Sequence, residues 1–117
     1  MHNYKELKIW KESIQLVKDL YPVLNSFPED EKYNLISQIK RCSVSVPSNI
    51  AEGTSRKSNV DFKRFLQIGL WSLFEMETQL YLSCELGFMA SQDFKLFETR
   101  INELQKMIYG FSKSLDS

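Results

Sequence analysis

Apolar residues recur every three or four positions along most of this 117-residue chain. That spacing places side chains on one face of an α-helix. The pattern predicts four helices, over residues 5–25, 28–53, 58–88 and 91–115. No stretch reads as a strand. Four helices with short connections predict an all-α fold, a single domain over residues 1–117 built as an antiparallel up-and-down four-helix bundle.

The third predicted helix, over residues 58–88, is the most apolar and carries two neighbouring stripes. The first stripe consists of Leu66, Gly69, Leu73, Met76, Leu80, Ser83 and Gly87. The second consists of Leu70, Phe74, Glu77, Tyr81, Cys84 and Phe88. Because two stripes leave little surface for water, we expect this helix to be central to the bundle or buried in a subunit interface.

Three serines mark the predicted helix starts. Ser26 with Glu29 forms a capping-box pattern before the second helix. Ser58 with Asp61 repeats that pattern before the third helix, and Ser91 can cap the fourth. A side-chain oxygen at such a position accepts a hydrogen bond from an otherwise unpaired backbone N–H.

A polar face runs along the second predicted helix. Its central members are Gln38, Arg41, Ser45, Asn49 and Glu52. Pro47 lies within this helix and removes one backbone donor, which favours a kink. Two interpretations stay open: the kink bends the helix around its neighbours, or it shapes a polar pocket that holds Ser45, Asn49 and Glu52.

Two carboxylates, Glu75 and Glu77, lie among apolar neighbours on the third predicted helix. Acids in such surroundings are rarely buried unless they are paired. We therefore expect them to form ion pairs with Arg41 or Arg56, between helices or between subunits. The alternative is a pocket for a ligand or partner.

Charge is balanced overall but uneven along the chain. The formal net charge is zero, yet residues 40–64 hold six basic and two acidic residues. Four of these basic residues would cluster at one end of the bundle: Arg56, Lys57, Lys63 and Arg64. They form a candidate rim for nucleic-acid phosphates, with a merely solvated surface as the alternative.

The residues of catalytic and metal sites are scarce. His2 is the single histidine, at the N-terminus, so a catalytic triad has no internal base. Cys42 and Cys84 do not form a Cys-x-x-Cys pair, and we expect both to be reduced core thiols. We therefore expect a non-enzyme without metal or cofactor. The lack of a signal-like or membrane-spanning run favours the cytoplasm, with no membrane partner.

The segment RCSVSVPSNIAEGTSR, residues 41–56, resembles the signature of the 23S ribosomal RNA intervening-sequence protein family, also called S23. Further matches include LKIWKESIQLV from residue 7 and SLFEMETQLYL from residue 72. The accessory variability determinant of diversity-generating retroelements shares this fold. The resemblance implies a four-helix bundle assembled as a ring-shaped homo-oligomer, a pentamer, associated with RNA, DNA or a nucleic-acid enzyme. Cys42 and Trp71 depart from the family's usual small residues, which affects the expected oligomer number.

Two hypotheses of function follow. In the first, a non-enzymatic homo-oligomer binds RNA or DNA phosphates, or a nucleic-acid-processing partner, through its basic rim, and its binding weakens steeply with salt. In the second, the protein is a structural or protein-interaction scaffold without nucleic-acid binding. The polar face of the second helix then docks another protein or closes the oligomer.

Overall fold

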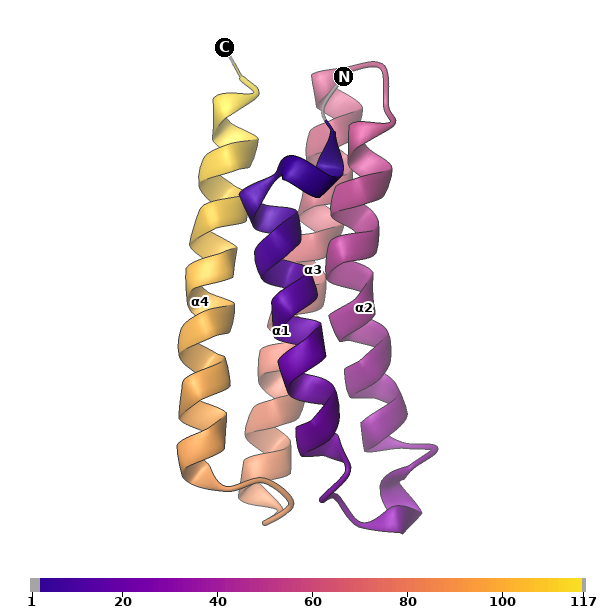
Figure 1. Cartoon of the computed structure of the whole chain (residues 1–117), viewed down its shortest axis with the longest axis vertical. Coiled ribbons are helices and arrows are strands. Elements are labelled where there is room, and N and C mark those ends of the chain that lie inside the picture. The colour runs from indigo at the N-terminus through magenta and orange to yellow at the C-terminus, as the bar shows by residue number, and fades with distance from the viewer. Residues whose placement is uncertain (1–2, 117) are drawn as a thin grey trace.

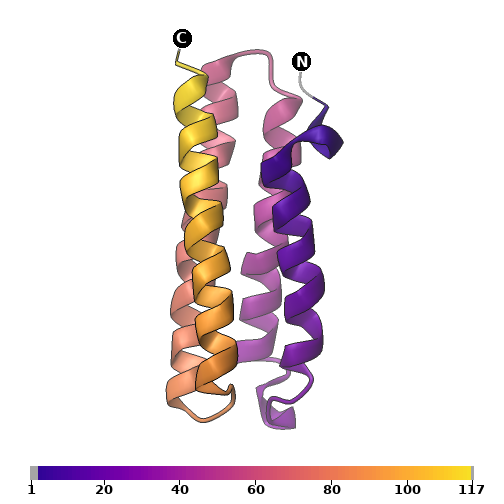
Figure 2. The same cartoon turned by 60° about the vertical axis from the view of Figure 1, so that its left-hand side comes forward.

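The computed structural model describes residues 3–116, which form four α-helices and no strand. The helices are α1 (Lys8–Leu24), α2 (Leu35–Thr54), α3 (Asn59–Glu85) and α4 (Ser91–Ser114). Each helix runs antiparallel to the one before it, and α4 returns beside α1 (Figure 1). The result is the predicted all-α up-and-down bundle, 45 Å long and 24 by 20 Å across. Figure 2 shows α1 and α2 on one side of the bundle and α3 and α4 on the other.

Each helix contributes one apolar stripe to a continuous core. The innermost side chains, which have almost no exposed surface, are Leu20, Leu24, Ile39, Val46, Ile50, Leu66, Leu73, Met76, Leu80, Ile101 and Ile108. They recur at three- and four-residue intervals, as the sequence pattern predicts. Burying one such side chain stabilises the fold by about 1.5–3 kcal/mol relative to exposing it.

The predicted start of the second helix is wrong by seven residues. Residues Glu29–Glu31 form a 3-10 turn, and α2 begins at Leu35. Ser26 does not cap a helix, because its hydroxyl donates to the Val23 carbonyl oxygen at 2.8 Å. Phe27 is 6% exposed and stacks against Phe88, at 5.9 Å between ring centroids. This tertiary contact holds the connection against the base of the bundle and overrides the local capping preference.

The ends of α3 follow the sequence prediction. Ser58 has an extended backbone, and its hydroxyl accepts a hydrogen bond from the Asp61 N–H at 3.1 Å. At the other end Gly87 has a φ of 81°. The Phe88 N–H donates to the Ser83 carbonyl at 2.9 Å, which completes a Schellman motif. The prediction that Ser91 caps α4 is wrong, because Ala90 holds the cap position without a side-chain hydrogen bond.

Close approach of α2 and α3 depends on a glycine. A Cβ atom on Gly53 would lie 2.7 Å from Cδ1 of Phe62 and 3.1 Å from Cβ of Phe65. Only a residue without a side chain therefore fits where the C-terminal end of α2 meets the start of α3. This contact sets the spacing of the two helices that carry the predicted polar and acidic residues.

The position of α3 corrects one expectation. The helix occupies a corner of the bundle, so its first stripe is buried while much of the second is not. Phe74 is 56% exposed and Tyr81 is 54% exposed. The prediction that this helix is central to the bundle is therefore wrong within a single chain. The alternative, burial between subunits, stays a prediction.

Candidate functional site

The four basic residues of the predicted rim lie together at one end of the bundle. Arg56 and Lys57 are in the α2–α3 connection, and Lys63 and Arg64 are in the first two turns of α3. The last turn of α4 reaches the same end, which is the upper end in Figure 1. We call this region, with Lys113 of α4, the basic end. The opposite end carries the acidic turn Glu29–Glu31.

Three of the four rim cations already contact carboxylates. Arg56 pairs with Glu52 at 2.8 Å, and Arg64 lies 3.6 Å from Asp61. Lys63 pairs with Asp116 of the α4 end. Such solvent-exposed pairs contribute about 0–1 kcal/mol, so a phosphate can compete for the cations. The carboxylates nevertheless reduce the positive potential that the sequence suggests.

Lys57 and Lys113 differ from the other cations of the basic end. Both are exposed, and neither forms an ion pair with any residue between 3 and 116. Arg56 is further engaged, because its guanidinium lies 4.5 Å from the Phe65 ring centroid. The two lysines are thus the cations that an anionic partner meets without displacing a carboxylate.

Some residues of the polar face of α2 form hydrogen bonds near α3, and the others are exposed to solvent. Ser45 lies 2.8 Å, oxygen to oxygen, from buried Ser72 of α3. The Asn49 amide donates to the Ser45 carbonyl at 2.8 Å and to its hydroxyl at 2.9 Å. The Ser72–Ser45 bond joins α3 to α2, whereas the Asn49 bonds fix its side chain along α2. Gln38, Arg41 and Glu52 are exposed instead.

Pro47 does not shape a polar pocket around Ser45 and Asn49. It lies within a continuous α2 and is buried on the side that faces α1. The Ser43 hydroxyl donates to the Lys40 carbonyl at 2.9 Å. The predicted polar pocket is therefore not formed around Pro47, and the predicted kink of the helix stays a prediction.

The expected pairs of Glu75 and Glu77 do not form within the described part of the chain. Arg56 pairs with Glu52 of its own turn, and Arg41 is exposed without an ion-pair partner among residues 3–116. Neither glutamate is fully buried, so water can solvate both. Pairing between subunits stays a prediction.

Cys42 is a buried thiol without nucleophilic character. Burial, with a smaller effect from the Glu75 carboxylate, raises its pKa from 9.0 to about 12. Its sulfur lies 3.3 Å from both the Ile39 carbonyl oxygen and Oε1 of Gln79. The thiolate is the reactive form of cysteine. Cys42 therefore serves packing, and both cysteines are free, as expected.

An exposed apolar stripe on α3 is the surface feature that sequence reasoning underrated. Its members are Trp71, 58% exposed, Phe74, 56%, Tyr81, 54%, and Leu82, 46%. We call these four residues the α3 ridge. They are separated by three, seven and one residues and lie on one side of the helix, with the exposed residues Glu75 and Thr78 between them. Phe74 and Tyr81 belong to the second apolar stripe of the sequence pattern, whereas Trp71 and Leu82 belong to neither stripe.

A groove between α3 and α4 continues the ridge. Its volume is about 480 Å³, and its lining residues are Gln67, Leu70, Phe74, Gln105, Lys106, Tyr109 and Gly110. Tyr109 is 66% exposed. Nε2 of Gln105 is buried without a hydrogen-bond partner within residues 3–116. Apolar side chains therefore extend from α3 across to α4.

A second apolar groove lies between α1 and α2, which we call the α1–α2 groove. Its volume is about 370 Å³. Its lining residues are Tyr4, Trp10, Ile14, Val17, Lys18, Val44, Pro47, Ser48 and Ala51. Val44 is 42% exposed although it is apolar. Most of this wall is hydrocarbon, so it suits an apolar side chain better than a phosphate.

Comparison with known proteins identifies the family. Residues 5–110 match the family model for 23S rRNA-intervening sequence protein. The chain belongs to this family. The resemblance carried by residues 41–56 is thereby confirmed, and the family match spans all four helices.

One solved member of the S23 ribosomal protein family has a similar fold. It is a protein with unknown function from Bacteroides thetaiotaomicron VPI-5482. The superposition has a TM-score of 0.79 at 23% sequence identity and covers 90% of this chain and 98% of that one. This likeness supports the fold alone. No curated protein matches the chain.

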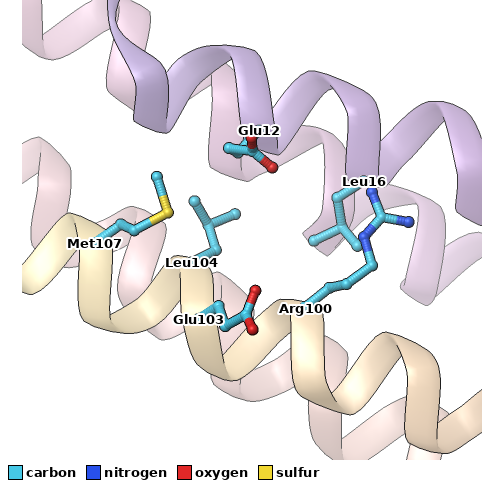
Figure 3. A pocket seen from close by; sticks show the side chains of 6 residues that line it. All are labelled: Glu12, Leu16, Arg100, Glu103, Leu104 and Met107. Atoms are coloured by element: carbon cyan, nitrogen blue, oxygen red, sulfur yellow. The ribbon is translucent and has the colours of Figure 1, made fainter.

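A small cavity of this 23S rRNA-intervening sequence family member lies between α1 and α4. Its lining residues are Glu12, Leu16, Arg100, Glu103, Leu104 and Met107 (Figure 3). The volume is about 30 Å³, roughly the space of one water molecule. Arg100 also pairs with Asp19 of α1 at 2.9 Å. The cavity therefore belongs to the packing of two helices.

Metal-ligand clusters and helices of membrane-spanning length are both absent from the part of this family member that the structure describes. Residues 3–116 contain no group of three His, Cys, Asp or Glu side chains placed to hold a metal ion. None of the helices within those residues is long and apolar enough to cross a bilayer. His2 lies outside the described residues.

Proposed function

We propose that this protein is a non-enzymatic scaffold that associates with further copies of itself through the exposed apolar surface of α3. The α3 ridge is the observation that carries the proposal. An isolated apolar side chain on a surface needs no explanation, but contiguous apolar patches mark interaction sites. Three aromatic rings and a leucine are exposed on one side of α3, and we infer that they act together as such a site.

The helix-packing spacing of the ridge supports a protein partner. Trp71 and Phe74 are three residues apart, and Tyr81 follows Phe74 after seven. A stripe with that spacing packs against a helix of another chain as it would against a helix of its own bundle. The five-membered ring implied by the family resemblance stays a prediction.

Sedimentation velocity at increasing protein concentration tests the scaffold function. We expect the wild-type chain to sediment as an assembly whose mass gives the number of copies, and the Trp71→Glu variant to sediment as a monomer. Leu96→Glu is the matched control, because Leu96 is 61% exposed on α4 and lies outside the ridge. A wild-type chain that stays monomeric at every concentration would contradict the proposal.

A second candidate function is contact with nucleic-acid phosphates at the basic end. Lys57 and Lys113 support it, because both are exposed without an ion-pair partner among residues 3–116. The family is named for an intervening sequence of 23S rRNA, so ribosomal RNA is one candidate partner. In an assembly, each copy repeats these charges, so the local potential increases.

Fluorescence anisotropy with labelled structured RNA and duplex DNA tests this second function. We expect binding that weakens steeply as salt increases, because phosphate contacts release counterions. Lys57→Ala combined with Lys113→Ala should weaken binding more than Arg64→Ala, since Arg64 already contacts Asp61. Lys95→Ala, on α4 toward the opposite end, is the control. If neither nucleic acid binds at low salt, this second function is contradicted and only the scaffold function remains.

A further inference from the structure

Two cavities join along the seam between α3 and α4. The groove of about 480 Å³ described above and a second cavity of about 260 Å³ share Gln67, Leu70 and Tyr109 as lining residues. The second cavity is also lined by Lys63 and Lys113 of the basic end. Figure 2 shows α3 and α4 side by side up to that end, where the C-terminus lies. We call the two cavities together the α3–α4 groove.

The half of the α3–α4 groove that lies away from the basic end presents aromatic rings. Phe74 is 56% exposed and Tyr109 is 66% exposed, and both line this half. Neither ring stacks on another aromatic ring within residues 3–116. A free aromatic face binds a flat heterocycle by stacking, as in the binding of unpaired nucleic-acid bases. This half therefore suits a flat aromatic ring.

Two amide side chains line the same half. Gln67 is exposed, and Nε2 of Gln105 is buried without a hydrogen-bond partner within residues 3–116. An amide offers a donor and an acceptor together, which is the pair that glutamine uses to read the edge of adenine. Because a buried donor without a partner is unfavourable, a ligand acceptor that pairs with Gln105 once its amide turns toward the groove is favoured. The amides favour a nucleobase over a hydrocarbon ring.

Cations lie one helical turn from these rings. Lys113 follows Tyr109 by four residues, about 6 Å along the helix and on the same side. That spacing resembles the separation of the base and the 5′-phosphate in a nucleotide. Lys113 is exposed and forms no ion pair within residues 3–116. Lys63 pairs with the Asp116 carboxylate, so one anionic group already lies in this half of the groove.

We propose that the α3–α4 groove binds a purine nucleoside 5′-phosphate, as a free nucleotide or as the first nucleotide of a single strand. The base stacks against Phe74 and Tyr109, and the Gln105 amide pairs with its edge. The phosphate contacts Lys113. The inference goes beyond the scaffold function and does not rest on it. It also differs from phosphate contact with a duplex, because it requires an unpaired base.

Gly110 allows the groove to be filled without disturbing the bundle. It is exposed and lines the groove, and a Cβ atom there would meet no neighbouring side chain or helix within 4 Å. Gly110→Phe therefore occupies the space of the base. Gly110→Ala adds only a methyl group and is the matched control, because both variants remove a glycine from α4. Circular dichroism and the melting temperature check that both fold.

Isothermal titration calorimetry with adenosine 5′-monophosphate at low salt tests the site. We expect saturable binding of one nucleotide per chain by the wild type and by Gly110→Ala, and none by Gly110→Phe. Adenosine and inorganic phosphate should each bind more weakly, because each fills only one half of the groove. Trp71→Glu is titrated beside the wild type, so that a second copy on the α3 ridge cannot hide the groove.

Two charge variants should change the affinity for this nucleotide in opposite directions. Lys113→Ala should weaken binding about tenfold, which is the effect of losing one hydrogen bond to a charged group. Asp116→Asn should tighten binding by up to about fivefold, because it releases Lys63 from an exposed ion pair. Lys95→Ala, exposed on α4 outside the groove, should bind like the wild type.

A single-stranded oligoadenylate that carries a 5′-phosphate distinguishes the two sources of the ligand. Equal affinity for the strand and for the nucleotide identifies a free nucleotide. Tighter binding of the strand, lost when its 5′-phosphate is removed, identifies a strand end. In both cases Gly110→Phe should abolish binding.

The inference is overturned if neither the wild type nor Trp71→Glu binds adenosine 5′-monophosphate. It is also overturned if Gly110→Phe binds the nucleotide like the wild type, because the site then lies elsewhere. Sedimentation velocity tests the scaffold function separately, and anisotropy with duplex DNA tests phosphate contact at the basic end. Failure of the nucleotide site is therefore distinguishable from failure of either proposed function.

Discussion

At the scale of single residues, the space around a position determines whether an added side chain stabilises or destabilises the fold. Gly53 and Gly69 both lie buried where α2 meets α3, and the sequence alone does not distinguish them. A Cβ atom on Gly53 would lie 2.7 Å from Cδ1 of Phe62. At Gly69 the nearest atom, the Val46 carbonyl oxygen, is 3.9 Å away.

The two glycine-to-alanine substitutions should therefore change stability in opposite directions. Overpacking costs about 1–3 kcal/mol, whereas replacing a helical glycine by alanine gains up to about 1 kcal/mol. We expect Gly53→Ala to lower the free energy of unfolding by about 1 kcal/mol or more. Gly69→Ala should leave it unchanged or raise it. Urea denaturation at one fixed protein concentration measures both, and equal effects would contradict this account.

The buried thiol of Cys42 should make stability depend on pH in alkaline solution. The pKa of this thiol is about 12 in the folded chain against 9.0 in a model thiol. Above pH 9 the unfolded thiol loses its proton while the folded one keeps it, so stability is lost as pH rises toward 12.

Comparison with Cys42→Ala isolates that effect from other alkaline titrations. Between pH 8 and pH 10, the wild type should lose about 1 kcal/mol more than Cys42→Ala. Cys84→Ala retains the Cys42 thiol and should follow the wild type. Urea denaturation at both pH values measures the difference, and parallel curves for wild type and Cys42→Ala would refute the assignment.

At the scale of elements, helix boundaries follow local chemistry only where tertiary contacts agree with it. Ser58 caps α3 as predicted, with its hydroxyl 3.1 Å from the Asp61 nitrogen. Ser26 offers the same local pattern, yet its hydroxyl donates to the Val23 carbonyl. Burial of Phe27 against Phe88 determines how the chain passes from α1 to α2.

Removing the hydroxyl of Ser58 should therefore destabilise the bundle, whereas the same change at Ser91 should not. Loss of an N-cap side chain costs about 1 kcal/mol. We expect Ser58→Ala to lower the free energy of unfolding by that amount, and Ser91→Ala to change it by less than about 0.5 kcal/mol. Chemical denaturation measures both variants. A larger effect at Ser91 would mean that its hydroxyl caps α4 after all.

At the scale of the whole molecule, the order of the helices determines which apolar surface stays exposed. Four helices around one core bury one face of each, so the additional apolar residues of α3 lie outside. Among them are Trp71 and Phe74, 58% and 56% exposed. The same order places Arg56, Lys57, Lys63 and Arg64 together at one end, although the carboxylates of Glu52 in α2 and of Asp116, just after α4, reach that end as well.

Self-association should appear in thermal unfolding as well as in mass. Anything that binds only the folded state makes the melting temperature depend on concentration. We expect the melting temperature of the wild type to rise with protein concentration and that of Trp71→Glu to stay constant. Leu96→Glu should behave like the wild type. Differential scanning calorimetry over a range of concentrations measures this, and a constant wild-type value would contradict self-association.

The sequence by itself determined the helical class, the core stripes and the clustering of the basic residues, because these depend on spacing along one helix or on nearness along the chain. Ile39, Val46 and Ile50 are buried as their periodicity predicts. The family match over residues 5–110 confirms the resemblance that rested on local motifs.

Only the tertiary structure decided how residues far apart in the chain meet. Lys63 pairs with Asp116, and Ser45 contacts Ser72. The partners are set by the rotation and axial position of whole helices, which the periodicity of one helix does not specify. For the same reason the sequence showed two apolar stripes on α3, and the bundle alone determined that Phe74 and Tyr81 of the second stripe are exposed while its Leu70 is buried.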